Sequence, residues 1–163
     1  MGIFDKLFGS KSKELSLGAP VAGEAVPVRE VNDPTFGEEL LGKGIAIKPT
    51  SGRIVAPCDA VVELMFETGH AVSLKSDTGA EILIHVGLET ITLKGKHFKV
   101  HAKNGDHVEK GQLLIEFDCE AIAAEGFDII TPMVICNSDD FSAVNAYTGK
   151  TVAEGDVVIG LEK

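Results

Sequence analysis

Two of the five histidines in this chain stand where an imidazole could do chemistry. His85 lies in the middle of residues 79–90, GAEILIHVGLET, whose length and aliphatic content predict a β-strand. Because strand side chains alternate between two faces, we expect a row of Ile82, Ile84, Val86 and Leu88 to face the core and His85 to face outward. Gly87, on the same outward face, would leave room beside the imidazole for another molecule.

His70 lies in a second segment that we expect to be a strand, FETGHAVSL, residues 66–74. If this strand runs without a bulge, one of its faces carries Phe66, Thr68, His70, Val72 and Leu74. The short connection KSDTGA then predicts a hairpin closed by a two-residue turn. In that hairpin the two histidines would lie close together across the strand pair, with a threonine hydroxyl nearby.

Two adjacent imidazoles could bind a metal, assist hydrolysis or take part in group transfer. Two ligands are too few for a tight zinc site, which needs three or four, and no serine or cysteine nucleophile lies in a recognisable motif. A neutral imidazole is a good nucleophile near pH 7, and phosphoryl transfer asks the protein mainly for positioning and charge stabilisation. The pattern therefore favours one imidazole as a nucleophile and the other as its electrostatic helper.

The other three histidines predict no site. His107 lies in a polar turn, where a solvated imidazole is the ordinary outcome. His97 and His101 could share a strand face at a spacing of four residues. Without cysteine or carboxylate partners in the pattern, that spacing is weak evidence for a metal.

The composition limits which classes of partner and which cellular compartment we expect for this protein. The 163 residues are enough for one domain with a core. A net charge of -10 argues against nucleic acid and favours a basic protein as partner. The three cysteines form no C-x-x-C pair, and the chain shows neither a secretory signal nor a membrane-spanning apolar run. We therefore expect reduced thiols in a cytoplasmic protein.

Short apolar segments separated by glycine and proline predict an all-β protein, an antiparallel β-sandwich or barrel with short helical turns. The strand segments are residues 44–49, 52–57, 60–67, 70–76, 81–88, 112–118, 133–137 and 157–162, and the helical turns are residues 36–44 and 118–126. Residues 19–28 echo residues 56–64, and residues 104–118 echo residues 153–163. These echoes predict a duplicated, intertwined β motif.

The N-terminus differs from the rest of the chain. In residues 1–9 a helix would gather Ile3, Phe4, Leu7 and Phe8 into one apolar stripe, and the polar residues 10–18 have the composition of a linker. We therefore divide the chain into an amphipathic tail with linker, 1–17, and one domain, 18–163. Residues 1–9 could form a weak, reversible membrane contact, a frayed tail, or a helix docked on the domain itself.

The segment 79–91 resembles the signature of the glucose-type enzyme IIA domains of the bacterial sugar phosphotransferase system. That signature is glycine, two residues, three apolar residues, histidine, apolar, glycine, apolar, any residue, threonine, apolar. GKGIAIKPTSGRIVAPCDAVV, FETGHAV, LKGKHFK and LLIEFD follow the family's order, so the resemblance covers roughly residues 18–163.

This resemblance implies a β-sandwich phosphocarrier that needs no cofactor. The histidine matching His85 accepts a phosphoryl group from the small protein HPr through Nε2 and passes it to a cysteine of the permease's IIB domain. His70 and Thr68 match the family's second histidine and its threonine, which implies that His70 balances the charge of the phosphoryl group and that Thr68 orients an imidazole. Some relatives bind zinc through the paired histidines when a partner adds a carboxylate, and some regulate transporters or enzymes. Glu89 departs from the aspartate of many relatives.

The docking surface for such partners is expected to be apolar and to surround the histidines. Its predicted members are Phe36, Leu41, Phe66, Leu83, Gly87, Glu89 and Ile91. Two rival readings fit less well. A lipoyl- or biotinyl-type carrier domain would need a lysine exposed in a hairpin, which is missing, and a β-sandwich zinc peptidase would need an H-x-H motif.

Overall fold

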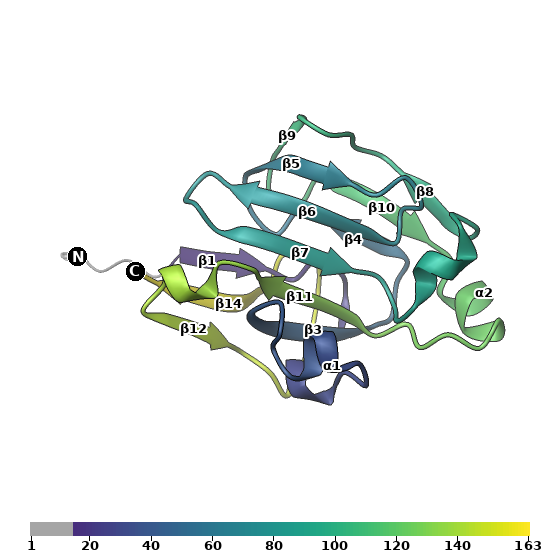
Figure 1. The fold of residues 1–163 in the computed structure, drawn as a ribbon, viewed down its shortest axis with the longest axis horizontal. Coiled ribbons are helices and arrows are strands. Elements are labelled where there is room, and N and C mark those ends of the chain that lie inside the picture. Colours follow the sequence, from purple (N-terminus) through teal and green to yellow (C-terminus); the bar gives the residue numbers. More distant parts are fainter. Residues whose placement is uncertain (1–14) are drawn as a thin grey trace.

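The computed structural model describes residues 15–163, which form a set of antiparallel strands with a few helical turns (Figure 1). The strands are β1 (Leu15–Gly18), β2 (Gly23–Pro27), β3 (Lys43–Pro49), β4 (Arg53–Val55), β5 (Ala60–Met65), β6 (Ala71–Ser76), β7 (Glu81–His85), β8 (Phe98–Val100), β9 (His107–Val108), β10 (Leu113–Phe117), β11 (Thr131–Ile135), β12 (Ala143–Ala146), β13 (Lys150–Val152) and β14 (Val157–Glu162). The α-helices are α1 (Pro34–Gly37) and α2 (Cys119–Ala124), and the 3-10 helices are η3 (Val28–Glu30), η4 (Thr90–Leu93) and η5 (Ser138–Asp140). Among these residues no helix is long and apolar enough to cross a membrane.

The strands form three sheets that enclose one main core. The large sheet has the order β13-β2-β3-β11-β7-β6-β5-β9, and the two small ones have the orders β1-β14-β12 and β4-β10-β8. Figure 1 shows β5, β6, β7 and β11 side by side in one layer. The main core joins all three sheets, with Ile84 from the large sheet, Leu114 from β10 and Ile159 from β14. The predicted antiparallel β-sandwich is confirmed.

The alternation predicted for the segment around His85 is also present. Ile82 and Ile84 are fully buried, whereas Leu83 and His85 are half-buried on the opposite face. Leu88 departs from the row, because it packs in a second, smaller cluster rather than in the main core. The chain changes direction at Gly87, whose φ of 75° lies in the left-handed region.

The predicted duplication appears as matching contacts. Gly18 N donates to Pro57 O at 2.8 Å, and Val55 N donates to Pro20 O at the same distance. The chain therefore crosses itself in the same way at Ala-Pro 19–20 and at Ala-Pro 56–57.

The two Gly-Asp turns match as well. Asp106 Oδ2 accepts a hydrogen bond from Lys103 N at 3.0 Å, and Asp156 Oδ2 accepts one from Ala153 N at 2.9 Å. Each turn precedes the central strand of a small sheet, β10 in one case and β14 in the other. The repeated unit is thus a turn held by its own aspartate and followed by a strand of the core.

Two local predictions were wrong. The segment 66–74 is not one continuous strand, because residues 66–70 form a turn in which Gly69 has a φ of 73° and donates from N to Phe66 O at 2.8 Å. After this turn Val72 faces the core, so it does not share a face with His70. The following hairpin has a three-residue loop, residues 77–79, rather than a two-residue turn, and Ser76 N donates to Ala80 O at 2.8 Å.

The domain also begins earlier than predicted. Residues 15–17, which we placed in the linker, lie in β1, which pairs with β14, and Leu17 is buried. The amphipathic helix predicted for residues 1–9 lies outside the described residues.

The burial pattern predicts a difference between two isoleucines. Ile84→Ala should lower the free energy of unfolding by about 2–5 kcal/mol, because it leaves a cavity in the core. Ile91→Ala is the matched control: this side chain is 53 % exposed, so we expect a change within about 0.5 kcal/mol. Urea unfolding followed by circular dichroism measures both, and equal losses would contradict the assigned faces.

Candidate functional site

His85 is the last residue of β7, and its ring is held by the backbone that follows it. Nδ1 lies 2.7 Å from Gly87 O. A carbonyl oxygen only accepts hydrogen bonds, so Nδ1 must be the donor and carry the hydrogen. In the neutral ring the lone pair is then on Nε2, which is the atom available as a nucleophile.

His70 ends the turn between β5 and β6 and is held on two sides. Its Nδ1 hydrogen bonds to Thr68 Oγ1, which is the orienting contact expected for this threonine. Its carbonyl accepts from Val86 N at 2.6 Å, so the turn is fastened to the residue after His85. Only 3 % of His70 is exposed.

Four rings form a continuous row across the site. Phe36 packs on His85, His85 on His70, and His70 on Phe66, with 5.1 Å between ring centroids in each pair. The two imidazoles are nearly perpendicular, with an interplanar angle of 80°. The predicted meeting of the two histidines therefore occurs, although β6 puts Ala71, and not His70, directly opposite His85.

The surroundings keep both imidazoles neutral at pH 7. Burial lowers the pKa of His70 to about 4, and the neighbouring His85 acts in the same direction. Burial also lowers the pKa of His85, while the hydrogen bond to Gly87 and the charge of Asp33 act in the opposite direction. A neutral imidazole keeps its lone pair, so both conditions for nucleophilic attack by His85 are met.

Asp33 is a neighbour of the site that sequence reasoning missed. Its carboxylate caps α1 by accepting from Thr35 N at 3.0 Å, and Pro34 follows as the first helical residue. The pair Asp-Pro is an ordinary signal for the start of a helix. Nothing in that signal shows that this helix carries Phe36 onto the ring of His85.

The predicted docking residues differ in exposure. Ile91 and Leu41 are exposed, at 53 % and 39 %, and Leu40, which we did not predict, is the most exposed of the large apolar side chains at 69 %. Phe66 and Leu83 are half-buried beside the rings, and Glu89 is exposed with a φ of 60°.

Two members of the predicted surface are buried. The prediction that Phe36 is an exposed docking residue was wrong. Its side chain is only 4 % exposed and packs against the ring of His85. Gly87 is buried as well, and it contributes its carbonyl.

The remaining histidines each pair with one carboxylate. His97 Nε2 lies 2.5 Å from Glu125, and His101 Nε2 lies 2.6 Å from Glu116. The predicted shared strand face is wrong, because β8 ends before His101 and His97 precedes it with a φ of 78°. His107 pairs with Asp77 at 3.1 Å.

Within residues 15–163 no group of three or more histidine, cysteine or acidic side chains is placed to hold a metal ion. His70 and His85 could supply two zinc ligands, which is fewer than zinc takes in a stable site.

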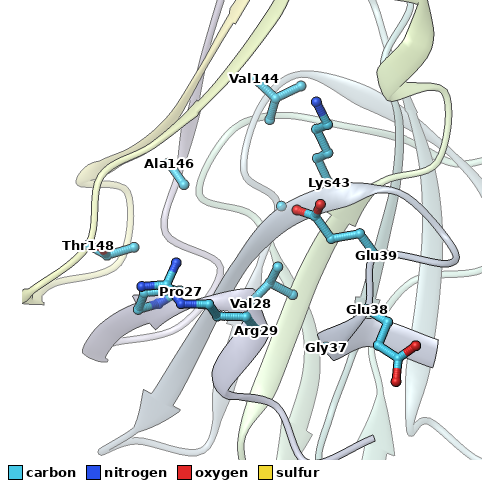
Figure 2. A pocket seen from close by; sticks show the side chains of 11 residues that line it. Pro27, Val28, Arg29, Gly37, Glu38, Glu39, Lys43, Val144, Ala146 and Thr148 are labelled. Carbon is cyan, nitrogen blue, oxygen red and sulfur yellow. The ribbon is translucent and has the colours of Figure 1, made fainter. Parts of the chain in front are cut away.

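A charged hollow beside α1 is separate from the histidines. It has a volume of about 450 Å³ between η3, α1, β3 and β12, and Figure 2 shows Glu39 and Lys43 together on its rim, with Arg29 reaching towards Thr148. A second hollow, of about 480 Å³, borders the site through Phe66 and Val100. His85 itself is half-buried on the outer face of the large sheet, where another protein surface could reach it, whereas His70 is buried beside it.

Comparisons with known proteins agree on one family. The family described as phosphoenolpyruvate-dependent sugar phosphotransferase system, EIIA 1, matches residues 15–141. A glucose-specific EIIA component of Haemophilus influenzae is 41 % identical over the full length of both chains. A β-glucoside-specific EIIBCA component of Dickeya chrysanthemi is 47 % identical over 89 % of this chain and 22 % of its own length.

A solved structure has the same fold. Glucose permease IIA from Mycoplasma capricolum matches with a TM-score of 0.85 and 30 % identity, covering 94 % of this chain and 99 % of its own.

The lowered pKa of His70 predicts a pH-dependent stability. Below pH 6.5 the unfolded chain takes up a proton on this residue, while the folded chain resists until about pH 4, so the native state loses stability as the pH falls through this window. His70→Gln lacks this contribution. Its stability relative to the wild type should therefore improve by on the order of 1 kcal/mol between pH 7 and pH 5. Urea unfolding at both pH values tests this, and a constant difference would contradict the assignment.

Proposed function

This chain belongs to the EIIA 1 family of the phosphoenolpyruvate-dependent sugar phosphotransferase system, and we propose that it is a phosphocarrier. In this proposal His85 accepts a phosphoryl group from HPr and passes it to the IIB domain of a glucose-type sugar permease. The observation that carries the proposal is the contact between His85 Nδ1 and Gly87 O, which leaves Nε2 as the free nucleophile.

The bonds and electron pairs of the proposed transfer balance without a cofactor. The Nε2 lone pair forms the new N–P bond while the bond between phosphorus and the donor atom breaks, and the donor keeps that electron pair. The positive charge that develops on the ring is stabilised by the hydrogen bond from Nδ1 to the Gly87 carbonyl. In the second step a cysteine thiolate of the IIB domain attacks phosphorus, and the electron pair returns to Nε2.

His70 supports both steps as a hydrogen-bond donor. If the Thr68 hydroxyl donates to Nδ1, the neutral His70 ring carries its hydrogen on Nε2. The perpendicular packing brings this ring against His85, where it can donate to a phosphoryl oxygen. A bound phosphoryl dianion would also raise the pKa of His70 and favour its charged form.

The partner surface we propose, called here the apolar rim, comprises the exposed side chains Leu40, Leu41 and Ile91. It also includes Phe66, which packs on His70, and Leu83, which shares the outer face of β7 with His85. The net charge of -10 would steer basic partners towards it. The β-glucoside-specific relative combines, by its name, B, C and A components in one protein, which supports a IIB domain as acceptor.

Four further expectations extend this proposal. A phosphoryl group on His85 would change the charge of the apolar rim. The proposal therefore includes regulation of a transporter or enzyme through this surface. Zinc is expected only where a partner adds a carboxylate to His70 and His85. The cytoplasmic location and the membrane contact of residues 1–9 stay predictions.

The acceptor assignment predicts the outcome of one substitution. His85→Ala should abolish phosphoryl uptake when the protein is incubated with phosphoenolpyruvate, enzyme I and HPr, because the nucleophile is gone. His107→Ala, which removes an exposed imidazole on β9, should keep wild-type uptake. Intact mass spectrometry measures the adduct, and an HPr-dependent phosphoryl group on His85→Ala would contradict the proposal.

The role of His70 predicts an asymmetry between the two half-reactions. His70→Gln keeps a hydrogen-bond donor but cannot become charged, so uptake from HPr should fall by less than about tenfold and transfer to IIB by roughly 10²-fold. Rapid-quench measurement of each half-reaction separates the two. Wild-type rates in both would show that His70 is only a neighbour.

A further inference from the structure

Thr90 has a position that the proposed mechanism does not yet use. It is the first residue of η4 and is fully buried. Its hydroxyl donates to Val86 O at 2.5 Å. A buried hydroxyl directed at the residue next to the acceptor histidine costs desolvation, which this bond offsets.

The same side chain also confines Gly87. A Cβ added to Gly87 would lie 2.8 Å from Thr90 Cγ2 and 2.9 Å from Asp128 O, so the glycine fits between them without room for a methyl group. Its φ of 75° is open to glycine at little cost. The threonine methyl and the Asp128 carbonyl therefore act as two walls around this residue.

The peptide groups on both sides of Gly87 are fastened separately. The carbonyl of Val86, which precedes it, accepts from Thr90, and the amide of Leu88, which follows it, donates to Asp128 O at 2.9 Å. Each peptide group is planar, so fixing Leu88 N also fixes the carbonyl of Gly87. That carbonyl is the one that holds His85 Nδ1.

We propose that Thr90 is a positioning residue that keeps the Gly87 carbonyl against His85 Nδ1 and so keeps Nε2 free as the nucleophile. The inference rests on the proposed function. Without a fixed acceptor at Nδ1, the neutral imidazole can move its hydrogen to Nε2, and a ring in that form has no lone pair there for attack. The hydroxyl holds the peptide group before Gly87, and the methyl group limits where Gly87 can move.

The test separates positioning from stability through the tautomer of His85. Thr90→Val keeps the shape and removes the hydroxyl, whereas Thr90→Ser keeps the hydroxyl. The matched control is Thr131→Val, because Thr131 is also fully buried and donates its hydroxyl to a backbone carbonyl, that of Ile129 at 3.0 Å. Nitrogen-15 NMR of the unphosphorylated proteins reports which ring nitrogen of His85 carries the hydrogen, and uptake from HPr is measured on the same samples.

We expect Thr90→Val to show a raised share of the Nε2–H form and an uptake rate lowered by about tenfold or more. Thr90→Ser and Thr131→Val should keep the wild-type tautomer and uptake within about threefold of the wild type. If Thr90→Val does not fold, Thr90→Ala takes its place with the same expectation.

A wild-type tautomer in the variant lacking the hydroxyl would overturn the proposal, even if uptake slowed. An equal tautomer shift in Thr131→Val would overturn it as well, since the effect would then follow from any buried hydroxyl. Absence of uptake in the wild type would instead count against the proposed function, while the tautomer measurement would still decide the role of Thr90.

Discussion

The hydrogen bond from His85 Nδ1 to the Gly87 carbonyl is the interaction on which the rest of the site depends. It decides which nitrogen of the ring is free, and it requires the chain to turn sharply two residues after the histidine. Only a glycine makes that turn at low cost, and only a glycine fits between Thr90 and Asp128. The regular strand β7 therefore ends at His85, and the irregular segment after it supplies the carbonyl that orients the ring.

The sheets supply the rigidity that this irregular segment lacks. His85 is anchored by a strand that pairs with β6 on one side and β11 on the other, and His70 is anchored where β6 begins. The two matching chain crossings at the Ala-Pro pairs join the strands of the small sheets, which pack on the same core as the large sheet. The histidines thus sit on a layer whose inner face is aliphatic, and burial against it and against the neighbouring rings keeps both of them neutral.

The sequence predicted the parts of this arrangement that follow from periodicity. Alternation in β7 placed Ile84 inside and His85 outside, as found. The same alternation rule failed for residues 66–70, because Gly69 adopts a left-handed backbone conformation in which a strand cannot continue. The histidines still meet, because His70 adjoins Ala71, the residue that the three-residue loop puts opposite His85. Asp33 was missed because its place near His85 depends on a contact between separate segments, which no local pattern encodes. Thr90 was missed because its hydroxyl reaches Val86 O only after the chain has turned at Gly87, and Leu40 because an apolar residue type does not signal exposure.

The neutrality of the pair sets the terms on which a phosphoryl group can be held. In the proposed mechanism, the burial that lowers the pKa of His70 also makes a dianion beside it costly, so a phosphoryl group on His85 would be stabilised by hydrogen bonds rather than by a permanent charge. A permanently charged neighbour would bind the dianion more tightly and slow its release to the next protein. A neutral ring that gains a proton only when the dianion is present stabilises the dianion less than a permanent charge would. For a protein that must both accept and release the same group, the buried imidazole suits the task better than a lysine or arginine would.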